Sequence, residues 1–261
     1  MHARTLAREF RIALGLVEAL MCPGEALPDC CVGDATSWMT RALANRVPAM
    51  GDAVALGVVL EPGEPMVLRA TEVNGRLRDD FPDGFSLDDA HRPHLTVIQA
   101  YVAVDRLEES FAAIDTVVAT EPIGAWTLTA VGCYYIPGDG IGLAGIVVEP
   151  TKDLLRLQGS LLDAVAPFTV GTGSADAFVR RAEDPDINQP TIDYVGAFAS
   201  AGAGANYNPH ITVGIATRDY LDALVAEPFD PFTFAPIGAA GYQLANYGTA
   251  ARKLRDCPIH G

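Results

Sequence analysis

Two short stretches of this chain share a histidine that is followed two residues later by a threonine. Residues 92–97 read Arg-Pro-His-Leu-Thr-Val, and residues 208–213 read Asn-Pro-His-Ile-Thr-Val. With five histidines in 261 residues, roughly 0.3 His-x-Thr triplets are expected by chance, before the shared proline and valine are counted. The pattern therefore indicates a duplicated feature of the protein.

In each copy the histidine and the threonine are predicted to point to the same side of a strand. Side chains alternate along a strand, so residues i and i+2 share a face and lie roughly 6–7 Å apart along the backbone. If the two strands face each other, His94 and His210 form an imidazole pair flanked by the hydroxyls of Thr96 and Thr212. Imidazoles exchange protons near neutral pH, and hydroxyls hydrogen-bond to phosphate oxygens. The pattern predicts a site that handles a phosphate group.

The sequence around each motif repeats as well. An apolar, valine-rich stretch over 53–60 is followed by Glu-Pro, and Val-Val-Glu-Pro at 147–150 repeats that ending. Because a residue before proline is disfavoured in a helix, each stretch is predicted to be a strand that ends there. A helical pattern of apolar residues follows each strand. These residues are Met66, Ala70, Val73 and Leu77 in the first copy, and Leu154, Leu157, Leu161 and Val165 in the second.

A second helix and a final strand are predicted after each motif. Asp105 is the expected N-cap of the first of these helices, and Thr151 is the expected N-cap of the earlier helix in the second copy. The closing strands are expected over 126–136 and near 241–247, with a short strand at 232–234. The order strand-helix-strand-helix-strand thus occurs twice, which predicts an internal duplication.

The duplication predicts one domain over residues 52–256, made of two lobes at about 52–140 and 141–256. Each lobe would place its motif strand on one wall of a central cleft. The second lobe is longer because of residues 168–205, which are rich in Gly, Ala, Asp and Pro and are interpreted as an inserted loop. Residues 1–51 contain three of the five cysteines and a weak helical pattern. We interpret them as a peripheral arm or as the product of a start codon placed too far upstream.

Composition restricts the partners and the location. The net charge of −15 disfavours long nucleic acid, whose binding depends on Lys and Arg side chains. No apolar run reaches the 18 residues of a membrane helix, so no membrane partner is expected. The odd number of cysteines argues against a closed set of disulfides. A cytoplasmic protein is expected, although a faint similarity of the N-terminus to a signal peptide leaves secretion open. The oligomeric state is open, and a monomer is favoured.

Paired Pro-His-(Leu/Ile)-Thr-Val motifs in a duplicated α/β chain resemble the 2H phosphoesterase superfamily, the LigT-like group. The resemblance covers roughly residues 52–256. Residues 146–157, 184–194 and 242–253 are similar to a bacterial subgroup described as 2′-5′ RNA ligase family proteins. The resemblance implies an α/β (α+β) fold with two pseudo-symmetric lobes, whose antiparallel sheets line a central cleft.

The resemblance also implies an activity. It implies metal-independent hydrolysis of 2′,3′-cyclic phosphodiesters on nucleotides or short RNA ends, with a 2′-phosphomonoester as product and no cofactor. His94 would be the proton donor and His210 the proton acceptor, with Thr96 and Thr212 on the phosphate oxygens. Two alternatives stay open at this point. One is ATP-independent 2′-5′ RNA ligation through the same histidines, and the other is a non-catalytic nucleotide-binding protein.

Other residues near the motifs give weaker signals. His91 lies close to His94 and two aspartates, but there is no third ligand at a metal-site spacing, so we interpret His91 as a loop residue. Three tyrosines near the motif strands could stack on a base, although packing in the core or at a rim is favoured for each. A basic cluster near the C-terminus could guide phosphates, and a solvated edge explains it equally well. These residues are Tyr101, Tyr207 and Tyr247, and Arg252, Lys253 and Arg255.

Overall fold

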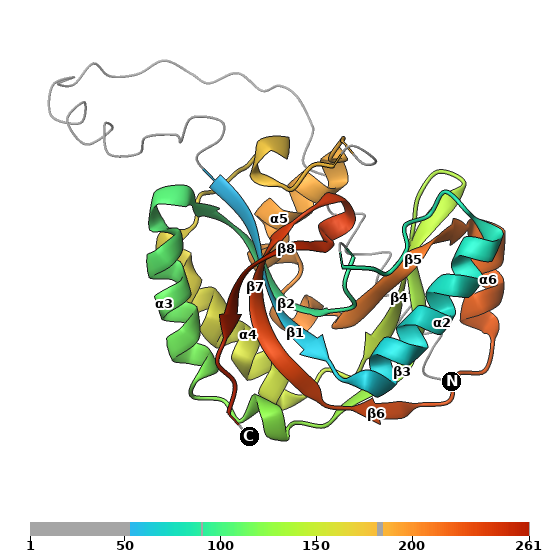
Figure 1. Cartoon of the computed structure of the whole chain (residues 1–261), viewed down its shortest axis with the longest axis horizontal. Helices are drawn as coiled ribbons and strands as arrows, with labels where there is room; N and C mark the ends of the chain where they lie inside the picture. Colours follow the sequence, from blue (N-terminus) through green and yellow to red (C-terminus); the bar gives the residue numbers. More distant parts are fainter. Residues whose placement is uncertain (1–52, 90, 182–184, 261) are drawn as a thin grey trace, which may run out of the picture. The chain divides into compact units, whose positions relative to one another are not determined.

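The computed structural model describes residues 53–260 except residue 90 and residues 182–184. The expected arm at 1–51 lies outside the described residues, as do its three cysteines. In the described range, eight strands form one antiparallel sheet in the order β6-β3-β4-β5-β2-β1-β7-β8 (Figure 1). The predicted α+β class is confirmed. The strands are β1 (Ala53–Pro62), β2 (Leu95–Ala103), β3 (Leu128–Pro137), β4 (Ile141–Val148), β5 (His210–Thr217), β6 (Phe232–Phe234), β7 (Pro236–Leu244) and β8 (Ala250–Cys257).

The sheet consists of two halves that meet where β2 lies beside β5. In the described residues these two strands share a single registered pair, Leu95 with Ile211. By contrast, β4 and β5 pair from Ile141 to Val147, with one register shift between Ala144 and Gly145. One half therefore contains β1, β2, β7 and β8, and the other contains β3, β4, β5 and β6. Each half carries one of the two motif strands.

The two halves of the sheet do not follow the lobe boundary expected near residue 140. Strand β3 precedes this boundary but pairs with β4, and β7 follows it but pairs with β1. The physical reason for the first pairing is the short turn between β3 and β4, where Gly140 has a φ of +74° and lets the chain reverse directly. The two repeats therefore exchange their last strands.

Four helices cover the sheet through the apolar stripes that the sequence predicted. Helices α3 and α4 pack against the half with β2 and β8, while α2 and α6 pack against the half with β3, β4 and β5 (Figure 1). All four predicted apolar residues of α2 and all four of α4 are buried. None of the described helices combines the length and apolar character needed to cross a membrane. The helices, with α5, are α2 (Glu64–Asp80), α3 (Leu107–Val118), α4 (Lys152–Val165), α5 (Gln189–Ala201) and α6 (Arg218–Ala226).

One of the two predicted helix caps is confirmed. The hydroxyl of Thr151 accepts a hydrogen bond from the Leu154 N–H at 3.1 Å and caps α4. The prediction for Asp105 is wrong, because Asp105 lies in a 3₁₀ turn and Arg106 occupies the N-cap position of α3. The chain makes this extra turn before the α-helix begins, which moves the cap by one residue.

The segment at 168–205 is more ordered than the expected loop, because it contains helix α5. Asn188 caps this helix by accepting from the Thr191 N–H at 2.8 Å. The helix lies over β2, where the hydroxyl of Tyr101 donates to the Ile192 carbonyl at 2.9 Å. A small apolar cluster that includes Tyr101 and Val195 joins the helix to the sheet. The segment therefore covers part of the sheet face that Tyr101 shares with the motifs.

Candidate active site

The junction between β2 and β5 brings the two motifs together. Leu95 and Ile211 are paired and fully buried on the helix side of the sheet. The residues on either side of them therefore face the opposite side. In each motif the histidine comes one residue before the paired residue and the threonine one residue after it, so both motifs lie at the point where the two strands meet.

Each motif strand contains a β-bulge at the valine that follows its threonine. On β2 the register passes from Thr96 to Ile98 and leaves Val97 without a partner position. On β5 it passes from Thr212 to Gly214 and leaves Val213 in the same situation. A bulge bends its strand and re-aims the neighbouring side chains. The two motifs therefore share a backbone irregularity as well as a residue pattern.

Both imidazoles are fixed through the same ring nitrogen. The Nδ1 of His94 lies 2.7 Å from the Arg92 carbonyl, and the Nδ1 of His210 lies 2.7 Å from the Asn208 carbonyl. A carbonyl oxygen only accepts, so Nδ1 carries the proton and donates in each case. In the neutral form this leaves the Nε2 lone pair as the proton-accepting position. Each histidine thus presents Nε2 for proton transfer.

The surroundings of the two histidines differ. Burial lowers the pKa of His94, while the Arg92 and Gly248 carbonyls and the Glu61 carboxylate act in the opposite direction. Burial also lowers the pKa of His210, to about 4, and positive charge on His94 lowers it further. His210 has only the Asn208 carbonyl to oppose this. The protonated form is therefore better supported at His94, and the neutral form at His210.

The two threonine hydroxyls are available to a ligand. Thr96 and Thr212 are partly buried, and among the described residues neither hydroxyl forms a hydrogen bond. Tyr134 closes the site beside His210, with its ring edge-on to the imidazole and the ring centroids 4.9 Å apart. A Cβ atom on Gly145 would lie 2.6 Å from the Tyr134 ring, so glycine is required for this packing.

Tyr207 lies just before the second motif and forms a hydrogen bond to the backbone of the first motif. It is buried, and its hydroxyl donates to the Thr96 carbonyl at 2.5 Å. We expect Tyr207→Phe to lower the free energy of unfolding by about 1–2 kcal/mol, because the Thr96 carbonyl loses its donor. Urea unfolding monitored by circular dichroism measures this change. Tyr135→Phe is the control, since its bond to Asp222 is exposed and its removal should cost less than about 0.5 kcal/mol. Equal losses in the two variants would contradict this role for Tyr207.

The weaker candidates from the sequence have local roles. The ring of His91 stacks on Phe85 with centroids 4.9 Å apart, and its Nδ1 lies 3.2 Å from Asp88. Among the described residues, no group of three or more His, Cys, Asp or Glu side chains is arranged to hold a metal ion. Tyr101 is buried under α5, whereas Tyr247 is exposed and adopts a left-handed φ of 58° in the turn before β8.

The basic cluster near the C-terminus is engaged in contacts within the protein. Arg252 donates to the Gln243 side chain, and Lys253 pairs with Glu61 at 2.8 Å. Arg255 pairs with Asp115 at 2.9 Å. These contacts favour the interpretation of this cluster as part of β8 packing.

Sequence reasoning missed two buried amides beneath the motifs, Asn74 on α2 and Gln158 on α4. They are 5% and 1% exposed, respectively. Their signal in the sequence is a polar residue on an otherwise apolar stripe, beside Val73 in one helix and Leu157 in the other. Such a residue is buried at a cost unless its polar atoms are hydrogen-bonded, so its partners identify its role.

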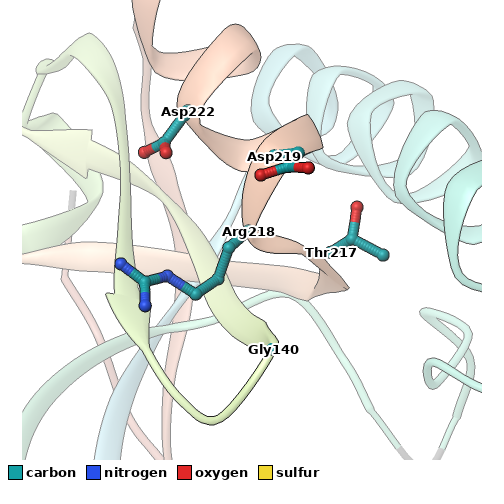
Figure 2. A pocket seen from close by; sticks show the side chains of 5 residues that line it. All are labelled: Gly140, Thr217, Arg218, Asp219 and Asp222. Atoms are coloured by element: carbon teal, nitrogen blue, oxygen red, sulfur yellow. The ribbon is translucent and has the colours of Figure 1, made fainter.

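A pocket of about 510 Å³ lies at the far end of β5 from His210. Figure 2 shows the Arg218 side chain and the carboxylates of Asp219 and Asp222 around it. The Thr217 hydroxyl is already bonded to Asp80 at 2.7 Å. Seven residue-to-residue steps of extended strand lead from His210 to Thr217, or roughly 23 Å. The pocket is therefore distinct from the two motifs.

No protein-family model matches the chain, and no curated protein matches it. Several solved structures are similar to it. The Thermus thermophilus protein TT0787 is 16% identical with a TM-score of 0.48, and the match covers 80% of this chain and 99% of that one. E. coli LigT complexed with ATP is 14% identical with a TM-score of 0.39 and the same coverage. Kluyveromyces marxianus Usb1 is 13% identical with a TM-score of 0.43, covering 81% and 100%.

Proposed function

We propose that this protein hydrolyses 2′,3′-cyclic phosphodiesters on nucleotides or short RNA ends, with His94 as the acid and His210 as the base. The observation that supports this most is the β2–β5 junction, which sets two equivalent His-x-Thr motifs beside each other with both imidazoles held through Nδ1. A single histidine can accept or donate only one proton at a time. Opening a cyclic phosphodiester with water requires a proton to be removed at one oxygen and supplied at another.

In the proposed reaction, His210 Nε2 takes a proton from the attacking water. The water oxygen forms a bond to phosphorus, and the bond from phosphorus to the ribose O3′ breaks. His94 donates the proton on Nε2 to O3′, which leaves as a hydroxyl, and the phosphate stays on O2′. The proton gained by His210 and the proton lost by His94 balance. The reaction draws on two imidazoles for its proton transfers and on no cofactor.

The hydroxyls of Thr96 and Thr212 would bind the non-bridging phosphate oxygens. Negative charge on these oxygens increases as water attacks, and a donor placed in advance stabilises that charge. The Leu95–Ile211 pair supports this assignment, because each threonine lies one residue from the junction and shares a strand face with the histidine of its own motif. A phosphate bound between the strands would contact both donors and both imidazoles.

The proposal is tested by incubating the protein with each of the four 2′,3′-cyclic nucleotides in excess EDTA and separating the 2′- and 3′-phosphate products. We expect turnover that yields the 2′-phosphate. A parallel incubation tests for 2′-5′ ligation. It combines an RNA that ends in a 2′,3′-cyclic phosphate with an RNA that begins with a 5′-hydroxyl. Products in the ligation arm alone would favour the ligase alternative. Saturable binding of the cyclic nucleotides without product in either arm would favour a non-catalytic nucleotide-binding protein.

The pH dependence follows from the two shifted pKa values. His210 acts when neutral, so its pKa of about 4 places the acid limb of kcat/KM near pH 4. His94 acts when protonated, and burial lowers its pKa in the free protein, so the basic limb lies below the pH at which an ordinary histidine titrates. Bound phosphate raises the pKa of His94, so kcat should persist to higher pH than kcat/KM. Steady-state rates from about pH 3.5 to about pH 9 measure both curves. A kcat/KM that keeps rising above neutral pH would contradict these roles.

A further inference from the structure

Asn74 and Gln158 hold the main chain at the two bulges. The side-chain amide of Asn74 donates to the Val213 carbonyl at 2.8 Å, and that of Gln158 donates to the Val97 carbonyl at 3.1 Å. A bulged residue is left out of the strand ladder, so its carbonyl needs another donor. Each amide supplies that donor to the valine of one motif.

The same two side chains also reach the segment that leads into the opposite motif. The Asn74 oxygen accepts from the Leu87 N–H at 3.2 Å, and its amide also donates to the Phe85 carbonyl at 3.0 Å. These residues belong to the segment before His94. The Gln158 oxygen accepts from the Gly204 N–H at 2.9 Å, in the segment before His210. Each amide thus connects the bulge of one motif to the approach of the other.

The packing around the second bulge accommodates this contact. Gly214 follows the bulged Val213 and has a φ of +148°, which few other residues adopt. A Cβ atom there would lie 2.9 Å from the Asn74 amide nitrogen and 3.0 Å from Leu77. Gly214 therefore lets α2 approach the strand closely enough for the hydrogen bond. An apolar residue at position 74 would fill the same stripe without the cost of burying an amide.

We propose that Asn74 and Gln158 are positioning residues that fix the two histidine motifs relative to each other. Asn74 connects α2 to both motifs, and Gln158 connects α4 to both motifs. The expected fall in kcat rests on the proposed function, whereas the expected displacement of the two histidines does not. A displacement of reacting groups by about 1 Å can reduce a rate by about 100-fold. The reduction should fall mainly on kcat, because the proton transfers depend on position more steeply than substrate binding does.

The test compares Asn74→Leu and Gln158→Met with a control, Leu161→Ala. Leu161 lies on α4 one turn after Gln158 and is fully buried, so its truncation destabilises the same helix without removing a bond to a motif. In protein labelled with ¹³C and ¹⁵N at histidine, the imidazole signals of His94 and His210 report the geometry of the pair. We expect both sets of signals to move in both amide variants and to stay in place in Leu161→Ala. We expect kcat to fall about 10–100-fold in the amide variants, with KM within about threefold of wild type.

Unchanged imidazole signals in both amide variants would overturn the proposal, as would an equal displacement in Leu161→Ala. Displaced signals in a protein that turns over no cyclic phosphate would leave the positioning role standing and sink the proposed function. Thermal unfolding of each variant confirms that the spectra are recorded on folded protein. If Asn74→Leu does not fold, Asn74→Asp replaces it, because the carboxylate keeps the acceptor for Leu87 and loses the donor to Val213. The same displacement is expected in that variant.

Discussion

Replacing either motif histidine by alanine is expected to lower kcat on 2′,3′-cyclic nucleotides by about 10²–10⁴-fold. The physical reason is that His94→Ala removes the group that protonates O3′, and His210→Ala removes the group that accepts the proton of water. Steady-state kinetics in EDTA measure both variants. The double variant should be only slightly slower than either single variant, because two groups that act in one step are not additive.

His91→Ala is the matched control for this series. His91 lies three residues from His94, yet its ring stacks on Phe85 in the loop before the motif. The same substitution there should leave kcat within about threefold of wild type. Loss of activity in all three variants would point to a general effect on the fold. Wild-type kcat in either His94→Ala or His210→Ala would rule out the proposed pair.

Replacing the motif threonines by valine is expected to lower kcat by about 10²–10³-fold for each hydroxyl removed. Valine keeps the branched shape and favours strands, so Thr96→Val and Thr212→Val should fold like wild type. Each substitution removes one donor from the oxygens on which negative charge increases during attack. Thr→Ser at the same positions retains a hydroxyl and should recover most of the rate. Steady-state kinetics and thermal unfolding on the same samples separate activity from stability.

The control for the threonine series is Thr233→Val on β6. This residue is exposed at the edge of the same sheet, so its hydroxyl has no role in the proposed site. Its kcat should equal that of wild type. If KM rises in Thr96→Val while kcat stays unchanged, the hydroxyl binds substrate and transition state equally. That result would contradict a role in stabilising charge during the reaction.

The four polar residues proposed for the site were chosen from the sequence alone, because a repeated local pattern singles them out. Alternation along a strand gives His94 and Thr96 one face without any knowledge of the fold. The helical stripes were equally local, and all four predicted residues of α2 are buried. Strand alternation and helical stripes depend on residues that are only a few positions apart, so they can be recognised in a single sequence.

The exchange of strands and the two amide contacts could not be predicted in this way. Pairing of β3 with β4 depends on a three-residue turn, and pairing of β7 with β1 joins residues 174 to 187 positions apart. Valine is common in strands, so the sequence pattern at Val97 and Val213 does not indicate a bulge. Helix α5 was missed because few of its residues face the core, chiefly Val195 and Phe198. Interactions between distant segments determine the pairing of β7 with β1 and the two amide contacts.

The most direct test of the central claim follows oxygen from water into the product. The protein is incubated with a 2′,3′-cyclic nucleotide in H₂¹⁸O and excess EDTA, and the product is analysed by mass spectrometry and ³¹P NMR. We predict one ¹⁸O atom per turnover, attached to the phosphorus of a 2′-phosphate, and about 10²–10⁴-fold less labelled product in the same time with His94→Ala or His210→Ala. Incorporation into the ribose 3′-hydroxyl, or undiminished incorporation in either histidine variant, would contradict the two-histidine mechanism.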